Sequence, residues 1–215
     1  MNRTLEHILP RVQKPARYTG GEYNAVVKDR RAVDVRYALC FPDTYEIGMS
    51  NLGVRILYGL MNEMDGVWCE RVFAPWGDME EEMRREGIPL YGLESGDSIA
   101  DFDLIGFSLG YEMAYTNVLN MLDLAGLPLR SGERTELSPI VVAGGTCAFN
   151  PEPLAPFVDL FVLGEGEDVS VEIIQLYRQA REEGWGKEEF LTAAARIPGV
   201  YVPSLYEVSY HGDGT

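Results

Sequence analysis

The feature that most constrains the fold is an alternation of apolar runs with helical patterns that begins at Val33. Four runs are apolar enough for buried strands: 33–41, 103–109, 139–143 and 160–163. The run 103–109 has the continuously apolar character expected of a strand that is covered on both faces of a sheet. Patterns of helical period follow three of the four runs, at about 50–64, 112–125 and 167–182. Strands and helices that alternate in this way form parallel βαβ units with right-handed crossovers. The sequence therefore predicts an α/β fold with a doubly wound, mainly parallel sheet.

Shorter elements complete this prediction. We expect strands at 67–73 and 88–93, helices at 77–85 and 187–196, and edge strands at 200–202 and 206–210. The stretch 1–32 has Pro10, Pro15 and the Gly20-Gly21 pair but no long apolar period, so we interpret it as an N-terminal extension that packs on the domain or on a partner. The α/β domain is then expected at 33–183. Residues 184–215 are expected to form a helix, edge strands and a polar linker at the cut end of a longer protein.

The charge of the chain is acidic overall but unevenly distributed. The 215 residues include 18 basic and 34 acidic side chains, giving a net charge of −16, which repels phosphate backbones and anionic lipid. Residues 1–36 instead carry more basic than acidic side chains. This basic arm could contact RNA or dock on acidic protein, and the sequence leaves both open. No apolar run approaches the roughly 18 residues of a membrane span, and the N-terminus lacks a signal-peptide pattern, so a cytoplasmic protein is expected.

Residues with strong intrinsic reactivity are scarce. Cys40, Cys69 and Cys147 show no CxxC or CxxxCxxC spacing, so we expect reduced thiols and no metal site. Histidine occurs only at positions 7 and 211, which excludes a Ser-His-Asp or Cys-His arrangement within the α/β domain. We assign no catalytic residue, and the chain alone is poorly equipped as an enzyme.

Four glycine-rich loops follow predicted strands: 42–51, 108–112, 144–146 and 164–167. Open parallel sheets bind ligands at the carboxyl ends of their strands, where glycines permit close approach and helix N-termini offer N–H donors. Tight strand-to-helix turns are the structural alternative. The loops match neither a dinucleotide fingerprint nor a P-loop, because a third glycine and a GxxxxGK[ST] motif are missing. Their carboxylates either converge for proton transfer or cap helices: Asp43, Glu46, Glu112, Glu165 and Glu167.

The order of these loops carries a resemblance to a known family. The stretches "VDVRYALCFPDTYEIGMSNLG", "DLIGFSLGYEMAYTNVLNMLDLAGLP" and "PIVVAGGTCAFNPEPLAPFVDLFVLGEGED" resemble the N-terminal cobalamin-binding-like domain of radical S-adenosylmethionine (SAM) proteins, over residues 33–180. The arm "HILPRVQKPARYTGGEYN" and the tail "IPGVYVPSLYEV" extend the similarity to a little-characterised subfamily of iron–sulfur oxidoreductases. The resemblance implies a flavodoxin-like, cobalamin-binding-like three-layer sandwich. It also implies a downstream barrel whose CxxxCxxC motif holds a 4Fe-4S cluster and S-adenosylmethionine, so this chain would be an accessory domain.

The resemblance also implies a set of cofactor-binding residues, taken from the four loops: Asp43, Thr44, Tyr45, Gly48, Ser108, Leu109, Gly110, Gly144, Gly145, Thr146, Gly164, Glu165 and Gly166. Tyr45 replaces the histidine of the family's Asp-x-His-x-x-Gly loop, and a phenol with a pKa near 10 is a poor cobalt ligand at neutral pH. Cobalamin would therefore be held base-off and without a histidine ligand, with its nucleotide tail beside Ser108 and the Gly144-Gly145 turn. The alternatives are a cofactor-free docking or substrate-recognition module, with RNA as one substrate, and a free-standing flavoprotein.

Overall fold

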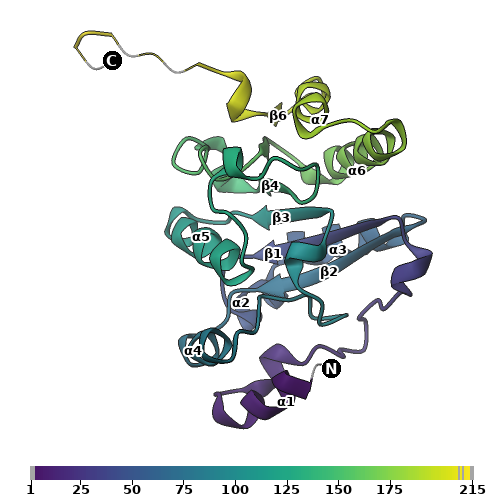
Figure 1. The fold of residues 1–215 in the computed structure, drawn as a ribbon, viewed down its shortest axis with the longest axis vertical. Coiled ribbons are helices and arrows are strands. Elements are labelled where there is room, and N and C mark those ends of the chain that lie inside the picture. Colours follow the sequence, from purple (N-terminus) through teal and green to yellow (C-terminus); the bar gives the residue numbers. More distant parts are fainter. Residues whose placement is uncertain (1–2, 208, 210, 214–215) are drawn as a thin grey trace.

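A six-stranded sheet organises the part of the chain that the computed structural model describes, residues 3–207, 209 and 211–213. The strand order is β2-β1-β3-β4-β5-β6 (Figure 1). Five strands are parallel: β1 (Val35–Phe41), β2 (Val67–Phe73), β3 (Leu104–Ser108), β4 (Ile140–Gly144) and β5 (Leu160–Val162). The short β6 (Val200–Tyr201) runs antiparallel to β5. Without β6, the order is that of the flavodoxin-like doubly wound fold.

Helices cover both faces of this sheet. One face packs against α1 (Arg3–Ile8), α4 (Gly77–Glu86) and α5 (Tyr115–Leu124), and the other packs against α3 (Leu52–Glu63), α6 (Gly166–Glu183) and α7 (Lys187–Ala194). The short helix α2 (Tyr45–Ser50) follows the carboxyl end of β1. The predicted α/β three-layer sandwich with a mainly parallel sheet is confirmed.

The two hydrophobic cores follow from the alternation of side chains along each strand. Ala38 and Cys40 of β1 join the core under α4 and α5, whereas Tyr37 and Leu39 join the core under α3 and α6. All seven residues of β1 are buried, including Arg36, whose guanidinium pairs with the buried Glu70 of β2. Burial of each large aliphatic side chain contributes about 1.5–3 kcal/mol to the stability of the fold. The strands are therefore stabilised mainly by side chains that pack against the helices on the two faces of the sheet.

The expected helix at 50–64 is confirmed as α3: the extended backbone of Asn51 ends α2, and the Asn51 side chain caps α3 by accepting from the Val54 N–H at 3.0 Å. Two other predicted elements differ from the structure. The expected strand at 88–93 is wrong, because Leu90 and Leu93 donate their backbone N–H groups to two different elements, α5 and β2, and no ladder forms. In the expected edge strand at 206–210, residues 206, 207 and 209 are not in a strand, and residues 208 and 210 lie outside the described residues.

The N-terminal arm docks on the chain's own acidic body. Leu5, Ile8, Val12 and Tyr18 are buried in the core beside α4. Each basic side chain described at positions 11–36 bonds to a carboxylate or a backbone carbonyl of the chain: Arg11, Lys14, Arg17, Lys28, Arg30, Arg31 and Arg36. The arm's excess of basic charge is therefore used for intramolecular contacts, and the structure gives no support to an RNA-binding role.

The outer edge of β2 is occupied by side chains of neighbouring segments. The Asn62 side chain accepts from the Cys69 N–H at 3.1 Å and donates to the Cys69 carbonyl at 2.9 Å. The Arg71 N–H donates to the Glu94 carboxylate, and the Arg71 carbonyl accepts from the Leu93 N–H. Lys28 donates to the Val67 carbonyl. The backbone groups along this edge are thus already hydrogen-bonded.

Candidate functional site

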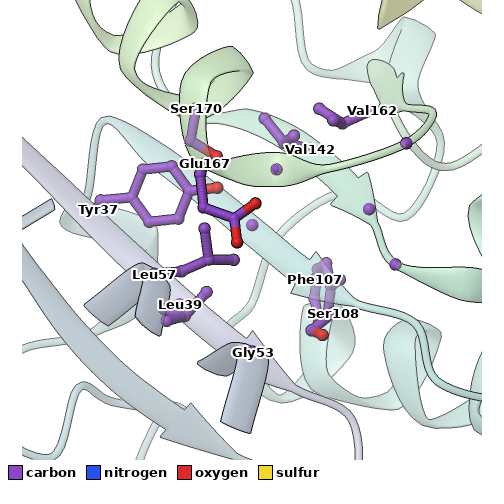
Figure 2. A pocket seen from close by; sticks show the side chains of 15 residues that line it. Tyr37, Leu39, Gly53, Leu57, Phe107, Ser108, Val142, Val162, Glu167 and Ser170 are labelled. Carbon is purple, nitrogen blue, oxygen red and sulfur yellow. The ribbon is translucent and has the colours of Figure 1, made fainter. Parts of the chain in front are cut away.

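A pocket of about 180 Å³ lies between the sheet and the two helices α3 and α6 (Figure 2). We call it the slot. It is lined by residues of β1, β3, β4 and β5 on one side and of α3 and α6 on the other: Tyr37, Leu39, Gly53, Leu57, Gly106, Phe107, Ser108, Val142, Gly144, Gly145, Val162, Gly164, Gly166, Glu167 and Ser170. An apolar cavity of about 150 Å³ admits a benzene ring, so the slot is large enough for a flat aromatic group but not for a whole large cofactor.

The slot begins at the carboxyl edge of the sheet and extends inward. Ser108 and Gly144 are the last residues of β3 and β4, so they lie at the mouth, whereas Tyr37 lies well before the end of β1. In Figure 2 the Tyr37 ring and Ser170 lie toward one end of the slot and Ser108 toward the other. The chain leaves β1 through α3 on one face of the sheet and leaves β3 through α5 on the opposite face. The slot therefore adjoins the topological switch point, where this fold binds ligands.

Gly106 makes room for the Tyr37 ring on the neighbouring strand. A Cβ atom at position 106 would lie 1.9 Å from the Tyr37 hydroxyl oxygen, so no larger residue fits there. Tyr37 is only 5% exposed, and burial raises the pKa of its phenol far above the ordinary value. The hydroxyl therefore keeps its proton and remains a hydrogen-bond donor at physiological pH.

Three hydroxyl groups line the slot without a hydrogen-bond partner among the described residues: those of Tyr37, Ser108 and Ser170. Tyr37 and Ser170 are buried. The walls around them are mainly apolar, formed by Leu39, Leu57, Val142 and Val162, and the Glu167 carboxylate also lines the slot. Because hydroxyl groups that face a cavity can donate to and accept from whatever occupies it, these three suit a polar ligand or ordered water.

Five of the predicted cofactor-binding residues line the slot: Ser108, Gly144, Gly145, Gly164 and Gly166. The second loop (108–112) and the third loop (144–146) are joined by backbone hydrogen bonds of Leu109 and by a tight turn at Gly145. The Leu109 N–H donates to the Gly144 carbonyl at 2.7 Å, and the Leu109 carbonyl accepts from the Cys147 N–H at 3.1 Å. Gly145 has a φ of +100°, and a Cβ there would lie 2.7 Å from the Leu109 carbonyl oxygen, so only glycine fits this turn. Gly110 and Thr146 lie beside this junction, where the Thr146 hydroxyl donates to the Gly110 carbonyl.

The first predicted loop, Asp43 to Gly48, lies outside the slot. Asp43 accepts from the Thr44 N–H at 2.6 Å and from the Tyr111 hydroxyl at 2.5 Å, which ties this loop to the one after β3. The Tyr45 hydroxyl donates to Glu22 of the N-terminal arm at 2.7 Å. Gly48 packs so closely on Phe73 that a Cβ would lie 2.2 Å from the ring. Glu165, from the fourth loop, precedes α6 and is exposed.

The remaining carboxylates of these loops do not form a metal site in the structure. Glu46 binds Lys14 and Arg17 of the N-terminal arm, and these cations lower the pKa of its carboxyl to about 2. Within residues 3–207, 209 and 211–213, no three or more His, Cys, Asp or Glu side chains gather so that they could hold a metal ion. The same residues contain no helix with the length and apolarity needed to cross a bilayer.

Sequence reasoning missed most of the slot walls: Tyr37, Leu39, Gly53, Leu57, Gly106, Phe107, Val142 and Val162 from the strands and α3, and Ser170 from α6. The sequence pattern predicts Glu167 only as a carboxylate for helix capping or proton transfer. Two signals pointed to these residues. Gly106 interrupts a strongly apolar strand, and a strand glycine often marks a close approach of another group. Ser170 lies on the apolar face of α6, among Ile173, Ile174 and Tyr177.

The family described as radical SAM proteins, N-terminal, matches residues 53–203. The chain belongs to this family. The matched region includes α3, α6 and the strands β3, β4 and β5, and therefore most of the slot.

A relative of the chain is an uncharacterized protein of Methanocaldococcus jannaschii, which is 28% identical over 140 residues. The similarity covers 64% of this chain and 26% of that protein, so the chain spans about a quarter of the length of the relative it matches. No solved structure gives a significant match.

Proposed function

We propose that this radical SAM N-terminal domain is an accessory domain that holds a corrinoid, cobalamin or a close analogue, base-off and without a histidine ligand. It would do so beside a downstream iron–sulfur barrel that binds S-adenosylmethionine. The observation that carries the proposal is the slot between the sheet and the helices α3 and α6, whose glycine-lined mouth lies at the carboxyl edge of the sheet. Family membership supports the placement of the domain beside such a barrel.

The residues of the slot fit the nucleotide tail of a corrinoid better than they fit its macrocycle. The cavity accommodates a flat aromatic base between apolar walls, and its unpartnered hydroxyls offer hydrogen bonds to the base or the sugar. Glycines at the mouth leave space for the chain of atoms that joins the base to the macrocycle. A bound corrinoid supplies radical and group-transfer chemistry at cobalt. The contribution of this chain is to bind the tail, leaving the macrocycle at the sheet edge.

Tyr45 does not offer a cobalt ligand in this arrangement. Its hydroxyl is bonded to Glu22, and its ring meets Phe73 edge-on at 5.4 Å between ring centroids. Burial and the hydrogen bond to Glu22 raise the Tyr45 pKa to about 12, so the phenolate form is scarce at neutral pH. These contacts support a corrinoid held by its tail rather than by a protein ligand to the metal.

The same edge of the sheet carries exposed apolar side chains that suit contact with the downstream barrel. Ile47, Leu52, Trp76, Met113 and Phe149 are each more than half exposed and belong to loops or helix starts that follow four parallel strands. Exposed apolar groups gathered at one edge indicate an interaction surface. The barrel is the occupant we propose, because the family is described as the N-terminal part of radical SAM proteins and the matched region makes up only 26% of the relative.

A visible-range titration with hydroxocobalamin, followed by desalting, tests corrinoid binding. We expect about one corrinoid per chain to remain with the protein. A Gly144→Trp variant should lose the corrinoid because the indole would occupy the mouth, whereas Gly144→Ala should retain it, since the nearest side-chain atom to an added Cβ is 3.6 Å away. A colourless wild-type protein would contradict the proposal and favour a cofactor-free docking domain.

A further inference from the structure

The positions of the polar groups in the slot influence which tail base of a corrinoid the slot can accept. Tyr37 and Ser170 lie at the inner end, and their hydroxyls have no hydrogen-bond partner in the described part of the chain. Between them and the mouth, the walls carry aliphatic side chains such as Leu57 and Val142, and the Glu167 carboxylate also points into the slot. A base that enters from the mouth therefore passes apolar walls and one carboxylate before it meets the two hydroxyls at its leading edge.

We propose that Tyr37, assisted by Ser170, selects the tail base of the corrinoid, favouring a base with hydrogen-bonding atoms at its leading edge, such as adenine, over dimethylbenzimidazole. This inference rests on the proposed function. Each hydroxyl can donate and accept, and the leading edge of adenine offers both an amino donor and a ring-nitrogen acceptor. The methylated edge of dimethylbenzimidazole offers neither, so it would leave both hydroxyls unsatisfied. A site built to hydrogen-bond a ligand rejects an analogue that lacks the bonding group.

The position of Tyr37 is set by the fold, so that its hydroxyl does not depend on the ligand for its orientation. The ring packs against Gly106 of β3, where even one added carbon would collide with it. Tyr37 is 5% exposed and belongs to the core formed with α3 and α6. A preorganised donor loses little conformational freedom on binding, which increases its value for selectivity.

Titrations with three corrinoids distinguish a failure of this inference from a failure of the proposed function. The three are cobinamide, which has no base; hydroxocobalamin, which carries dimethylbenzimidazole; and the analogue of hydroxocobalamin that carries adenine. We would measure their dissociation constants for the 215-residue chain by absorbance titration. The expected result is that the adenine-tailed corrinoid binds about tenfold tighter than hydroxocobalamin, as one or two added hydrogen bonds would produce. Cobinamide should bind most weakly of the three because it leaves the slot empty.

The variant Tyr37→Phe keeps the ring and removes only the hydroxyl. It should reduce the preference for adenine to about twofold or less, while hydroxocobalamin binds as tightly as before or tighter. Ser170→Ala should reduce the preference in part. Tyr201→Phe, which removes a hydroxyl bonded to Glu152 outside the slot, serves as the matched control and should leave the preference unchanged. The ratio of two affinities within one variant is insensitive to a loss of folded protein.

The outcomes are distinguishable. Equal affinity of the wild type for the two base-bearing corrinoids would overturn the selectivity and leave the proposed function standing. A preference for adenine that survives in Tyr37→Phe would overturn the role of Tyr37. Failure of all three corrinoids to bind would overturn the proposed function, and the selectivity with it.

Discussion

The hydroxyl of Tyr45 donates a hydrogen bond of 2.7 Å to Glu22, and the other carboxylate oxygen of Glu22 lies 2.6 Å from the Arg71 guanidinium. Tyr45 therefore joins the loop after β1 to the N-terminal arm and to β2. In the Asp-x-His-x-x-Gly pattern this position would hold a metal ligand. Here its side chain has a structural partner, and that partner comes from a segment outside the loop.

Replacing Tyr45 tests this structural role. Tyr45→Phe leaves the Glu22 carboxylate with one partner fewer and should lower the free energy of unfolding by about 1–2 kcal/mol. Tyr45→His should destabilise the chain similarly and should not give the absorption spectrum of a histidine-ligated corrinoid, because position 45 points at Glu22 and Phe73. Chemical denaturation and visible spectroscopy measure the two effects. A histidine-ligated spectrum would show that the loop can turn toward the cofactor.

The paired glycines after β4 should respond differently to alanine. Gly145→Ala places a side chain at φ +100°, within 2.7 Å of the Leu109 carbonyl oxygen, and should cost about 2 kcal/mol or more. Gly144→Ala meets no such obstacle and should change stability by less than about 0.5 kcal/mol. Thermal unfolding of the two variants gives the comparison. Equal losses would mean that the turn does not depend on the left-handed backbone at position 145.

Attachment of the N-terminal arm should depend on pH through Glu46. The pKa of Glu46 is lowered to about 2 by its hydrogen bond to Arg17, so the ion pair stabilises the fold above the ordinary carboxyl pKa of 4.5. That contribution is lost as the pH falls from 4.5 toward 2. A Glu46→Gln variant should be less stable than the wild type at pH 6 and should match it near pH 2. A difference that does not change between these pH values would contradict the assignment.

Asp159 should be among the residues whose loss is most damaging. It is fully buried between Arg134 and Lys187, and it also accepts from the Val141 N–H at 2.7 Å. Asp159→Ala would leave two buried cations without their anion and should cost about 3–5 kcal/mol. The exposed Asp34, paired with Arg178, is a matched control, and Asp34→Ala should cost no more than about 1 kcal/mol. Similar losses at the two sites would show that Asp159 is compensated by water.

The proposed barrel contact predicts protection at the carboxyl edge of the sheet. In a longer protein that includes the barrel, amide exchange should slow around Met113 and Phe149 relative to the 215-residue chain. The last turn of α6, where Arg181 pairs with Asp103 just before β3, lies at the opposite edge of the sheet and should exchange equally in both. Unchanged exchange at Met113 and Phe149 would mean that the barrel binds elsewhere.

The sequence predicts the layers of this fold better than it predicts the pocket. The buried strands and amphipathic helices are signalled by local apolar patterns, and so are the glycines at the mouth of the slot. Tyr37 has the same local pattern as any buried strand residue. Its exposure to a cavity depends on Gly106 facing it from β3, which only the pairing of β1 with β3 brings about.

The direction in which the Tyr45 side chain points could not be predicted from the sequence either. It depends on Glu22, which lies 23 residues earlier in a segment without a regular pattern. The same reason explains the false strand at 88–93, where the backbone of Leu90 and Leu93 bonds to two elements distant in sequence. Contacts of this kind are set by tertiary structure and leave no local signature.

The occupied edge of β2 has a consequence for how copies of this domain behave together. A strand at the border of a sheet ordinarily offers a template on which another chain can pair, with aggregation as the result. Here Asn62 and Glu94 already take the backbone groups that a visiting strand would need. At high concentration, molecules of this protein therefore cannot pair strand to strand along β2. Any assembly at this edge must use side-chain contacts instead.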